Sequence, residues 1–178
     1  MMDQTSMPLA HLLRVLVWIA AVLVILIPTM SWLSPAWQGV LQYQPGIVTR
    51  ADRAGTSRLL LFAALIPPYL SAAWGLFQLS GFCTRLSRGE HFSRAAAVSL
   101  RRFGISLVLA AALLPPSRLL ARALVQAGPN WEPTTQPLLG ITPILAVVFG
   151  VVLGLIAVVF AALLDKATSL AEENARFV

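Results

Sequence analysis

Few side chains in this sequence have the types and spacing that chemistry at a protein site requires. The two histidines, His11 and His91, are far apart in the chain and are not paired at the spacing of metal ligands. Cys83 is the single cysteine, so an internal disulfide and a cysteine-rich metal site are both excluded. There is no Ser–His–Asp order, no phosphate-binding glycine loop and no carboxylate pair where a membrane enzyme would use one. We therefore expect neither enzymatic activity nor a cofactor.

Arg118 and Arg122 come nearest to a charge cluster within a membrane. They stand four residues apart, so they share one face of a helix. Two interpretations are open. Their long side chains reach out toward the lipid headgroups, or they line a polar cavity, together with Glu132 or Asp52, in a subunit of a small-molecule or ion transport system.

The composition indicates that these residues are held in a lipid environment. Of 178 residues, 58% are hydrophobic and 11% are charged, with a mean hydropathy of +0.80, whereas soluble domains are about 25% charged. The net charge of +6 is carried in short segments between apolar stretches, a pattern typical of membrane topology signals. We expect contact with the lipid bilayer and no direct binding of nucleic acid.

Four apolar segments predict an all-α integral membrane four-helix bundle with helical cytoplasmic extensions. The Pro67–Pro68 pair should kink the second segment, and Pro115–Pro116 should interrupt the far end of the third. The fourth has 27 uncharged residues, enough to cross a bilayer core of about 30 Å with some tilt. The predicted spans are residues 15–33, 59–82, 100–124 and 138–164 of a single transmembrane domain covering residues 1–178.

The distribution of arginines sets the predicted orientation. Placing both termini inside leaves eight basic residues in the cytoplasm and five outside, as the positive-inside rule favours. The segments 83–99, a basic hairpin, and 165–178, a tail, would then be cytoplasmic, in the inner membrane of a bacterium. Cys83 should accordingly resist a membrane-impermeant thiol reagent in intact cells.

The basic hairpin contains local signals for a tight turn between two helices. Gly89 suits the end of a helix, Ser93 suits the next helix start, and Phe92 could pack on Ala97 as a hydrophobic staple. Two interpretations stay open here as well: a hairpin that fixes topology and touches anionic lipid, or a docking surface for a cytoplasmic protein.

The tail poses a similar choice. Its apolar residues can fall on one helical stripe, so it either extends the fourth span along the membrane or presents Glu172, Glu173 and Asn174 to the basic hairpin or to a partner.

A GxxxG motif in the fourth span predicts close helix packing. Gly150 and Gly154 form the motif, and Ala146 lies one turn earlier on the same face. Small residues let a second helix approach closely. That helix is either another span of the same chain or the same span of a second copy in a homodimer.

The hairpin and the tail resemble a bacterial family of four-span membrane proteins, the domain-of-unknown-function family 2975. The hairpin resembles it in an RxGExF-like turn followed by Leu-Arg-Arg-Phe-Gly, and the tail in the form A-x-x-L-A-E-E-N-x-x-F-V. The resemblance implies a membrane protein often encoded beside a small helix-turn-helix regulator. The residues that carry it are Arg88, Gly89, Glu90, Phe92, Leu100, Arg101, Arg102, Phe103, Gly104, Ala167, Leu170, Ala171, Glu172, Glu173, Asn174, Phe177 and Val178.

The sequence and this resemblance together favour a regulatory or adaptor protein that binds a cytoplasmic partner, such as a small helix-turn-helix transcriptional regulator. The alternative is the transport subunit. Residues expected to bind the partner are Arg88, Gly89, Glu90, Phe92, Arg101, Arg102, Glu172, Glu173 and Asn174.

Overall fold

The computed structural model describes residues 6–33, 58–87, 93–128 and 141–175, and nearly all of them are helical. The all-α class is therefore confirmed. The helices are α1 (Ser6–Leu33), α4 (Arg58–Leu65), α5 (Pro67–Ser87), α6 (Arg94–Gln126) and α7 (Ile141–Ala175).

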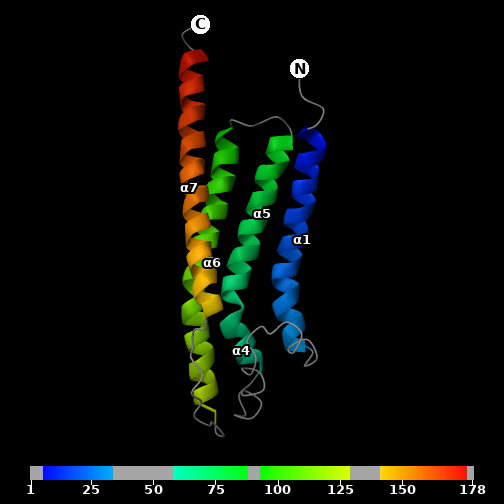
Figure 1. Cartoon of the computed structure of the whole chain (residues 1–178), viewed down its shortest axis with the longest axis vertical. Helices are drawn as coiled ribbons and strands as arrows, with labels where there is room; N and C mark the ends of the chain where they lie inside the picture. The colour runs from blue at the N-terminus through cyan, green and yellow to red at the C-terminus, as the bar shows by residue number, and fades with distance from the viewer. Residues whose placement is uncertain (1–5, 34–57, 88–92, 129–140, 176–178) are drawn as a thin grey trace.

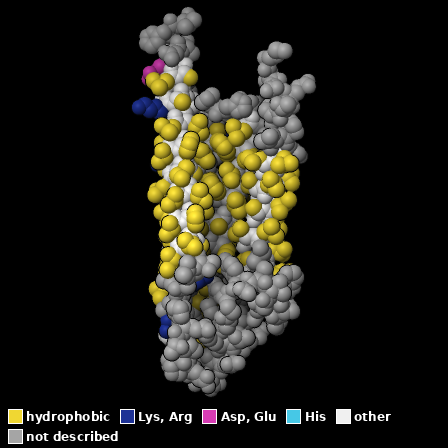
Figure 2. All heavy atoms as spheres, in the orientation of Figure 1, with side chains coloured by type: hydrophobic (Ala, Val, Ile, Leu, Met, Phe, Trp, Pro, Cys, Tyr) yellow, Lys and Arg dark blue, Asp and Glu magenta, His cyan; other side chains and the backbone are white. Residues whose placement is uncertain are grey.

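The helices have the length and composition of membrane spans. Segments of α1 and α7, and the whole of α6, are each long and apolar enough to cross a bilayer, and the bent pair of α4 and α5 would make a fourth crossing if it is one span. Large apolar side chains are exposed along these helices. In Figure 2, hydrophobic side chains cover the middle of the visible face, and the charged side chains of the described residues gather toward its two ends. Such an apolar band fits a lipid surface.

The chain passes up and down the long axis of the molecule and returns to the end where it starts. Figure 1 shows α1 and α6 running one way, α5 and α7 running the other, and the two chain ends at the same end of the molecule. We call this the terminal end. The end of α5 and the start of α6 also lie there, so the described parts of the hairpin and the tail are brought to one end.

The long helices stand in a row rather than around a common core. Each packs mainly on its neighbour, in the order α1, α5, α6, α7, and α4 packs on α5 and α6. The helices thus form an open layer where the sequence predicted a four-helix bundle. A closed bundle needs every helix to bury a stripe against several others, whereas here the buried residues concentrate on α6 and are mostly small.

Small side chains draw α5 and α6 together. The hydroxyl of Ser71 donates a hydrogen bond to the backbone oxygen of Ser106 across the two helices, at 3.0 Å. A Cβ atom on Gly75 would lie 2.7 Å from the hydroxyl oxygen of Ser106. Small and hydroxyl residues are the usual means of close helix contact in membranes.

The predicted kink at Pro67–Pro68 is confirmed. Helices α4 and α5 meet at Ile66 with a bend of 47°. A proline lacks the N–H that would bond one turn back, so the helix breaks at this pair. It restarts at once, because the N–H groups of Tyr69 and Leu70 donate to the oxygen of Ile66 at 3.0 and 3.1 Å.

The predicted interruption at Pro115–Pro116 is wrong. Helix α6 continues through both prolines to Gln126. The turns beyond them are packed against α4, where Leu61, Ala64 and Leu65 meet Ala121 and Val125 in a buried apolar cluster. This packing stabilises the helical conformation at the far end of α6, although the two prolines lack the N–H groups that would donate backbone hydrogen bonds.

Candidate docking surface at the terminal end

The start of α6 is fixed by the residue that the sequence suggested. Ser93 has extended backbone angles, and its hydroxyl oxygen accepts a hydrogen bond from the N–H of Ala96 at 3.1 Å. This is the geometry of a helix N-cap, which satisfies one of the free N–H groups of the first turn. Gly89 and Phe92 lie outside the described residues, so the turn and the staple stay predictions.

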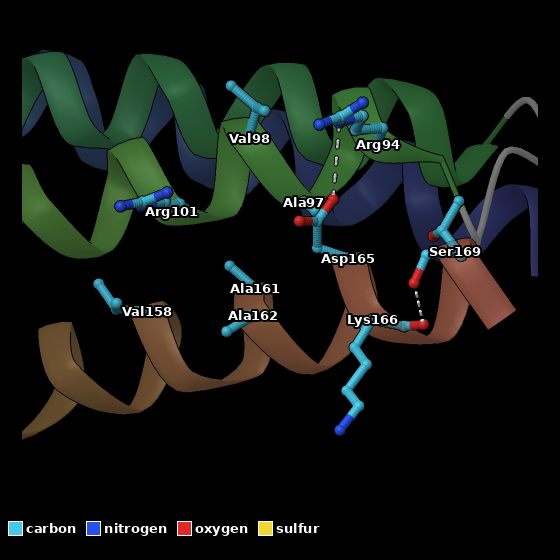
Figure 3. A pocket seen from close by; sticks show the side chains of 11 residues that line it. Arg94, Ala97, Val98, Arg101, Val158, Ala161, Ala162, Asp165, Lys166 and Ser169 are labelled. Atoms are coloured by element: carbon cyan, nitrogen blue, oxygen red, sulfur yellow. Dashed lines mark hydrogen bonds and ion pairs between the residues drawn. The ribbon is translucent and has the colours of Figure 1, made fainter.

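One ion pair links the second half of the hairpin to the start of the tail. The guanidinium Nε of Arg94 lies 3.8 Å from a carboxylate oxygen of Asp165, and the two side chains are 85% and 56% exposed. Figure 3 shows Asp165 rising from α7 toward Arg94 on α6, while Lys166 points away from α6. An exposed pair at this distance contributes about 0–1 kcal/mol to stability. It therefore shows which residues of α6 and α7 lie opposite each other but adds little to the stability of the helix pair.

The tail continues α7 as a straight helix. Asp165 of α7 lies beside Arg94, the first residue of α6. Thr168, about one turn further along α7, is still buried. Beyond it α7 carries on to Ala175, and residues 169–175 (the α7 extension) stand clear of the α6 start (Figure 1). At 1.5 Å per residue the extension is about 10 Å long.

The α7 extension offers both apolar and acidic side chains. Leu170 is 51% exposed, and Glu173 is exposed close to the end of the helix. Glu172 and Asn174 belong to the last turns of α7. The observed contact of the tail with the hairpin is made by Asp165, whereas the sequence suggested the three polar residues of the extension.

An open groove runs between α6 and α7, and its lining reaches Ser169 at the start of the extension. Its volume is about 690 Å³. Two arginines of α6 flank it, Arg94 and Arg101, and the small side chains of Ala97, Ala161 and Ala162 leave the space open. No sequence pattern pointed directly to this groove, although Asp165 is recognisable as the first charge after the fourth apolar segment, residues 138–164.

The other predicted docking residues are placed as follows. Arg101 and Arg102 are both exposed on α6, and Arg101 faces the groove while Arg102 is not part of its lining. Arg88, Gly89, Glu90 and Phe92 lie outside the described residues.

The GxxxG motif packs against α6 of the same chain. A Cβ atom on Gly154 would lie 2.7 Å from the backbone oxygen of Gly104, and one on Gly150 would lie 3.0 Å from the Cβ of Ala111. The two glycine positions are therefore used within the chain. Ala146, one turn earlier, is exposed.

At the opposite end of α6, Arg118 has an unusual environment. Its Nε atom is buried and has no hydrogen-bond partner among the described residues, and Arg122 is half-buried one turn later. Asp52 and Glu132, the proposed acidic partners, lie outside the described residues. A buried charged donor without a partner is costly, so this position is the second place where a ligand or an acidic group would fit.

The remaining chemistry-bearing residues form no site in the described part of the chain. No three of its His, Cys, Asp and Glu residues gather as metal ligands would. Cys83 is buried in the packing of α5, 1% exposed. Its thiol would therefore resist a labelling reagent from either side, and the labelling test suggested by the sequence does not report orientation.

Comparison with known proteins identifies a family for this chain. No curated protein and no solved structure matches the chain. The family model described as "Protein of unknown function (DUF2975)" matches residues 46–178, which include α4 to α7 and leave α1 outside. The match spans both the hairpin and the tail on which the sequence resemblance rests. The chain therefore belongs to the DUF2975 family.

Proposed function

We propose that this chain is a multi-pass protein of a bacterial inner membrane that acts by binding a cytoplasmic protein at its terminal end. The observation that carries the proposal is the topology: the end of α5, the start of α6 and the C-terminal end of α7 lie at the same end of the molecule (Figure 1). These are the two segments in which the family resemblance is concentrated. Loops and helix ends held by a rigid scaffold are where binding residues usually lie.

The α7 extension supports a protein as the partner. A short helix that stands clear of its neighbours gains little stability from packing, yet α7 stays helical to Ala175. Leu170 and Glu173 give it an apolar and an acidic side chain outside the packed layer. A helix of this kind can lay its apolar face in a partner's groove while its acids meet basic residues.

A small helix-turn-helix regulator fits this chemistry. DNA-binding proteins carry an excess of Lys and Arg, which complements the acidic residues Glu172 and Glu173 of the extension. The chain would then hold such a regulator at the membrane or release it, by binding and without catalysis.

The proposal is tested by co-purification of the full tagged chain in a mild detergent. Wild type should retain a small DNA-binding protein, and Leu170→Ala with Glu173→Ala should lower its retention about tenfold, the effect of removing about 1.4 kcal/mol of contact.

The matched control, Leu120→Ala with Gln126→Ala, changes two exposed residues at the other end of α6 and should leave retention unchanged. Retention of no soluble protein, or an equal loss in the control, would contradict the proposal.

The environment of Arg118 favours one second candidate, a subunit of a transport system. Its buried Nε has no described partner, and charged groups kept inside a membrane usually serve a pathway. On this alternative, the same purification should retain other membrane proteins. Arg118→Gln should release them, whereas the changes in the α7 extension should not.

A further inference from the structure

The groove between α6 and α7 has an arginine at each end and an apolar floor between them. Arg94 and Arg101 are seven residues apart and so lie on one face of α6, about 10 Å apart along its axis. Figure 3 shows Arg94 beside Asp165 at one end and Arg101 near Val158 at the other, with Ala97 and Ala161 between them. Two basic side chains therefore flank a floor of small apolar ones.

The groove exists because the residues that line it are small and because the helices touch just below it. A Cβ atom on Gly104 would lie 2.6 Å from the backbone oxygen of Gly154 and 2.9 Å from a methyl carbon of Val158. This close approach closes the lower end. Above it Ala97 is 4% exposed and Ala161 2% exposed, so both are floor residues too short to fill the space between the helices.

The charges of the groove are incompletely matched. Asp165 is the single acid in its lining, and it lies 3.8 Å from Arg94, which is beyond hydrogen-bond distance. Arg101 pairs with no carboxylate among the described residues. Lys166 lines the groove but points away from α6 (Figure 3). The groove therefore has one more positive than negative charge facing into it, which suits a singly charged anion.

We propose that this groove binds an anionic phospholipid, with its phosphate between Arg101 and Arg94, over Ala97 and Ala161, and an acyl chain along Ile105 and Leu109, which are exposed on the same face of α6 beyond Arg101. Guanidinium groups bind phosphate through paired N–H donors. Basic pockets between membrane helices at the headgroup level are suited to such lipids. Arg101 and Arg102 are the last two charges before the uncharged stretch of α6, and Asp165 is the first after that of α7, which places the groove at the level of the headgroups. The site does not depend on the protein partner proposed above.

The test is native mass spectrometry of the full chain in a neutral detergent with equal amounts of phosphatidylglycerol and phosphatidylcholine. Wild type should retain phosphatidylglycerol in preference. Arg101→Gln should lower that retention about fivefold, the effect expected of one arginine near anionic lipid. Asp165→Asn should raise it, because the competing carboxylate is neutralised while the side chain keeps its size.

Two further variants separate the groove from general attraction by basic residues. Ala162→Trp keeps every charge and fills the groove from an exposed position, so it should lower retention as Arg101→Gln does. Arg85→Gln removes one charge at the same end of the molecule, on α5 and outside the groove lining, and should leave retention unchanged.

Equal retention of the two lipids, or an equal loss in Arg85→Gln and Arg101→Gln, would overturn the proposal. Inorganic phosphate alone should not displace the lipid; displacement would show that the groove takes a free anion and would overturn the assignment to a phospholipid.

Discussion

Replacing Gly154 by valine should lower the free energy of unfolding by roughly 3 kcal/mol, because it forces α7 away from α6. A Cβ atom at this position would lie 2.6 Å from a methyl carbon of Val108, 2.7 Å from the oxygen of Gly104 and 3.1 Å from the nitrogen of Val108. Two of these three atoms belong to the backbone, which moves only if the whole helix moves. The cost should therefore fall at the upper end of the range for overpacking.

The measurement is reversible unfolding of the full chain in mixed micelles with increasing dodecyl sulfate, followed by circular dichroism. Gly81→Val on α5 is the matched control, since a Cβ atom there meets nothing within 4 Å. It should be neutral or slightly stabilising, because valine has a better helix propensity than glycine. Equal unfolding midpoints for the two variants would contradict the α6–α7 packing described here.

The second large effect is expected at the far end of the molecule. Leu61→Ala should cost about 2 kcal/mol, because Leu61 is fully buried in the cluster that joins α4 to α6. This cost is at the lower end of the range for buried leucines. In a membrane the alternative environment of the side chain is lipid and not water, so little free energy of transfer is lost. What is lost is mainly packing against Ala121 and Val125.

The neighbouring leucine supplies the control. Leu60 is 55% exposed, so Leu60→Ala should change the free energy of unfolding by less than about 0.5 kcal/mol. The same titration in mixed micelles measures both variants. If Leu60→Ala destabilises the chain as much as Leu61→Ala does, α4 is not docked on α6 in the register described.

Several elements were predictable because their cause is local. Ser93 caps α6 because hydroxyl residues accept from free N–H groups of the first turn. The bend at Pro67–Pro68 follows from missing donors. The close packing at Gly150 and Gly154 follows from their spacing. Each of these signals lies within a few residues of its effect.

Other features depend on partners that are distant in the sequence. Pro115–Pro116 carries the same local signal as Pro67–Pro68, yet α6 continues, and the difference is the α4 cluster packed beyond the prolines. The row of helices and the groove between α6 and α7 depend on which helix lies beside which. Helices that are apolar on all sides do not specify that order, because lipid can cover an apolar face as well as a neighbouring helix can.

The proposed function places the terminal end of the molecule at the cytoplasmic face, so orientation is its most direct test. Cys83 is buried and is best replaced by alanine. Single cysteines are then introduced at Ser169, exposed at the terminal end, and at Ala127, exposed at the opposite end of α6. Each variant is treated in intact cells with a membrane-impermeant thiol reagent, before and after permeabilisation.

The expected result is labelling of Ala127→Cys in intact cells and labelling of Ser169→Cys only after permeabilisation, as the positive-inside rule requires. Labelling of Ser169→Cys in intact cells, with Ala127→Cys protected, would place the α7 extension outside and contradict the proposed role in binding a cytoplasmic protein.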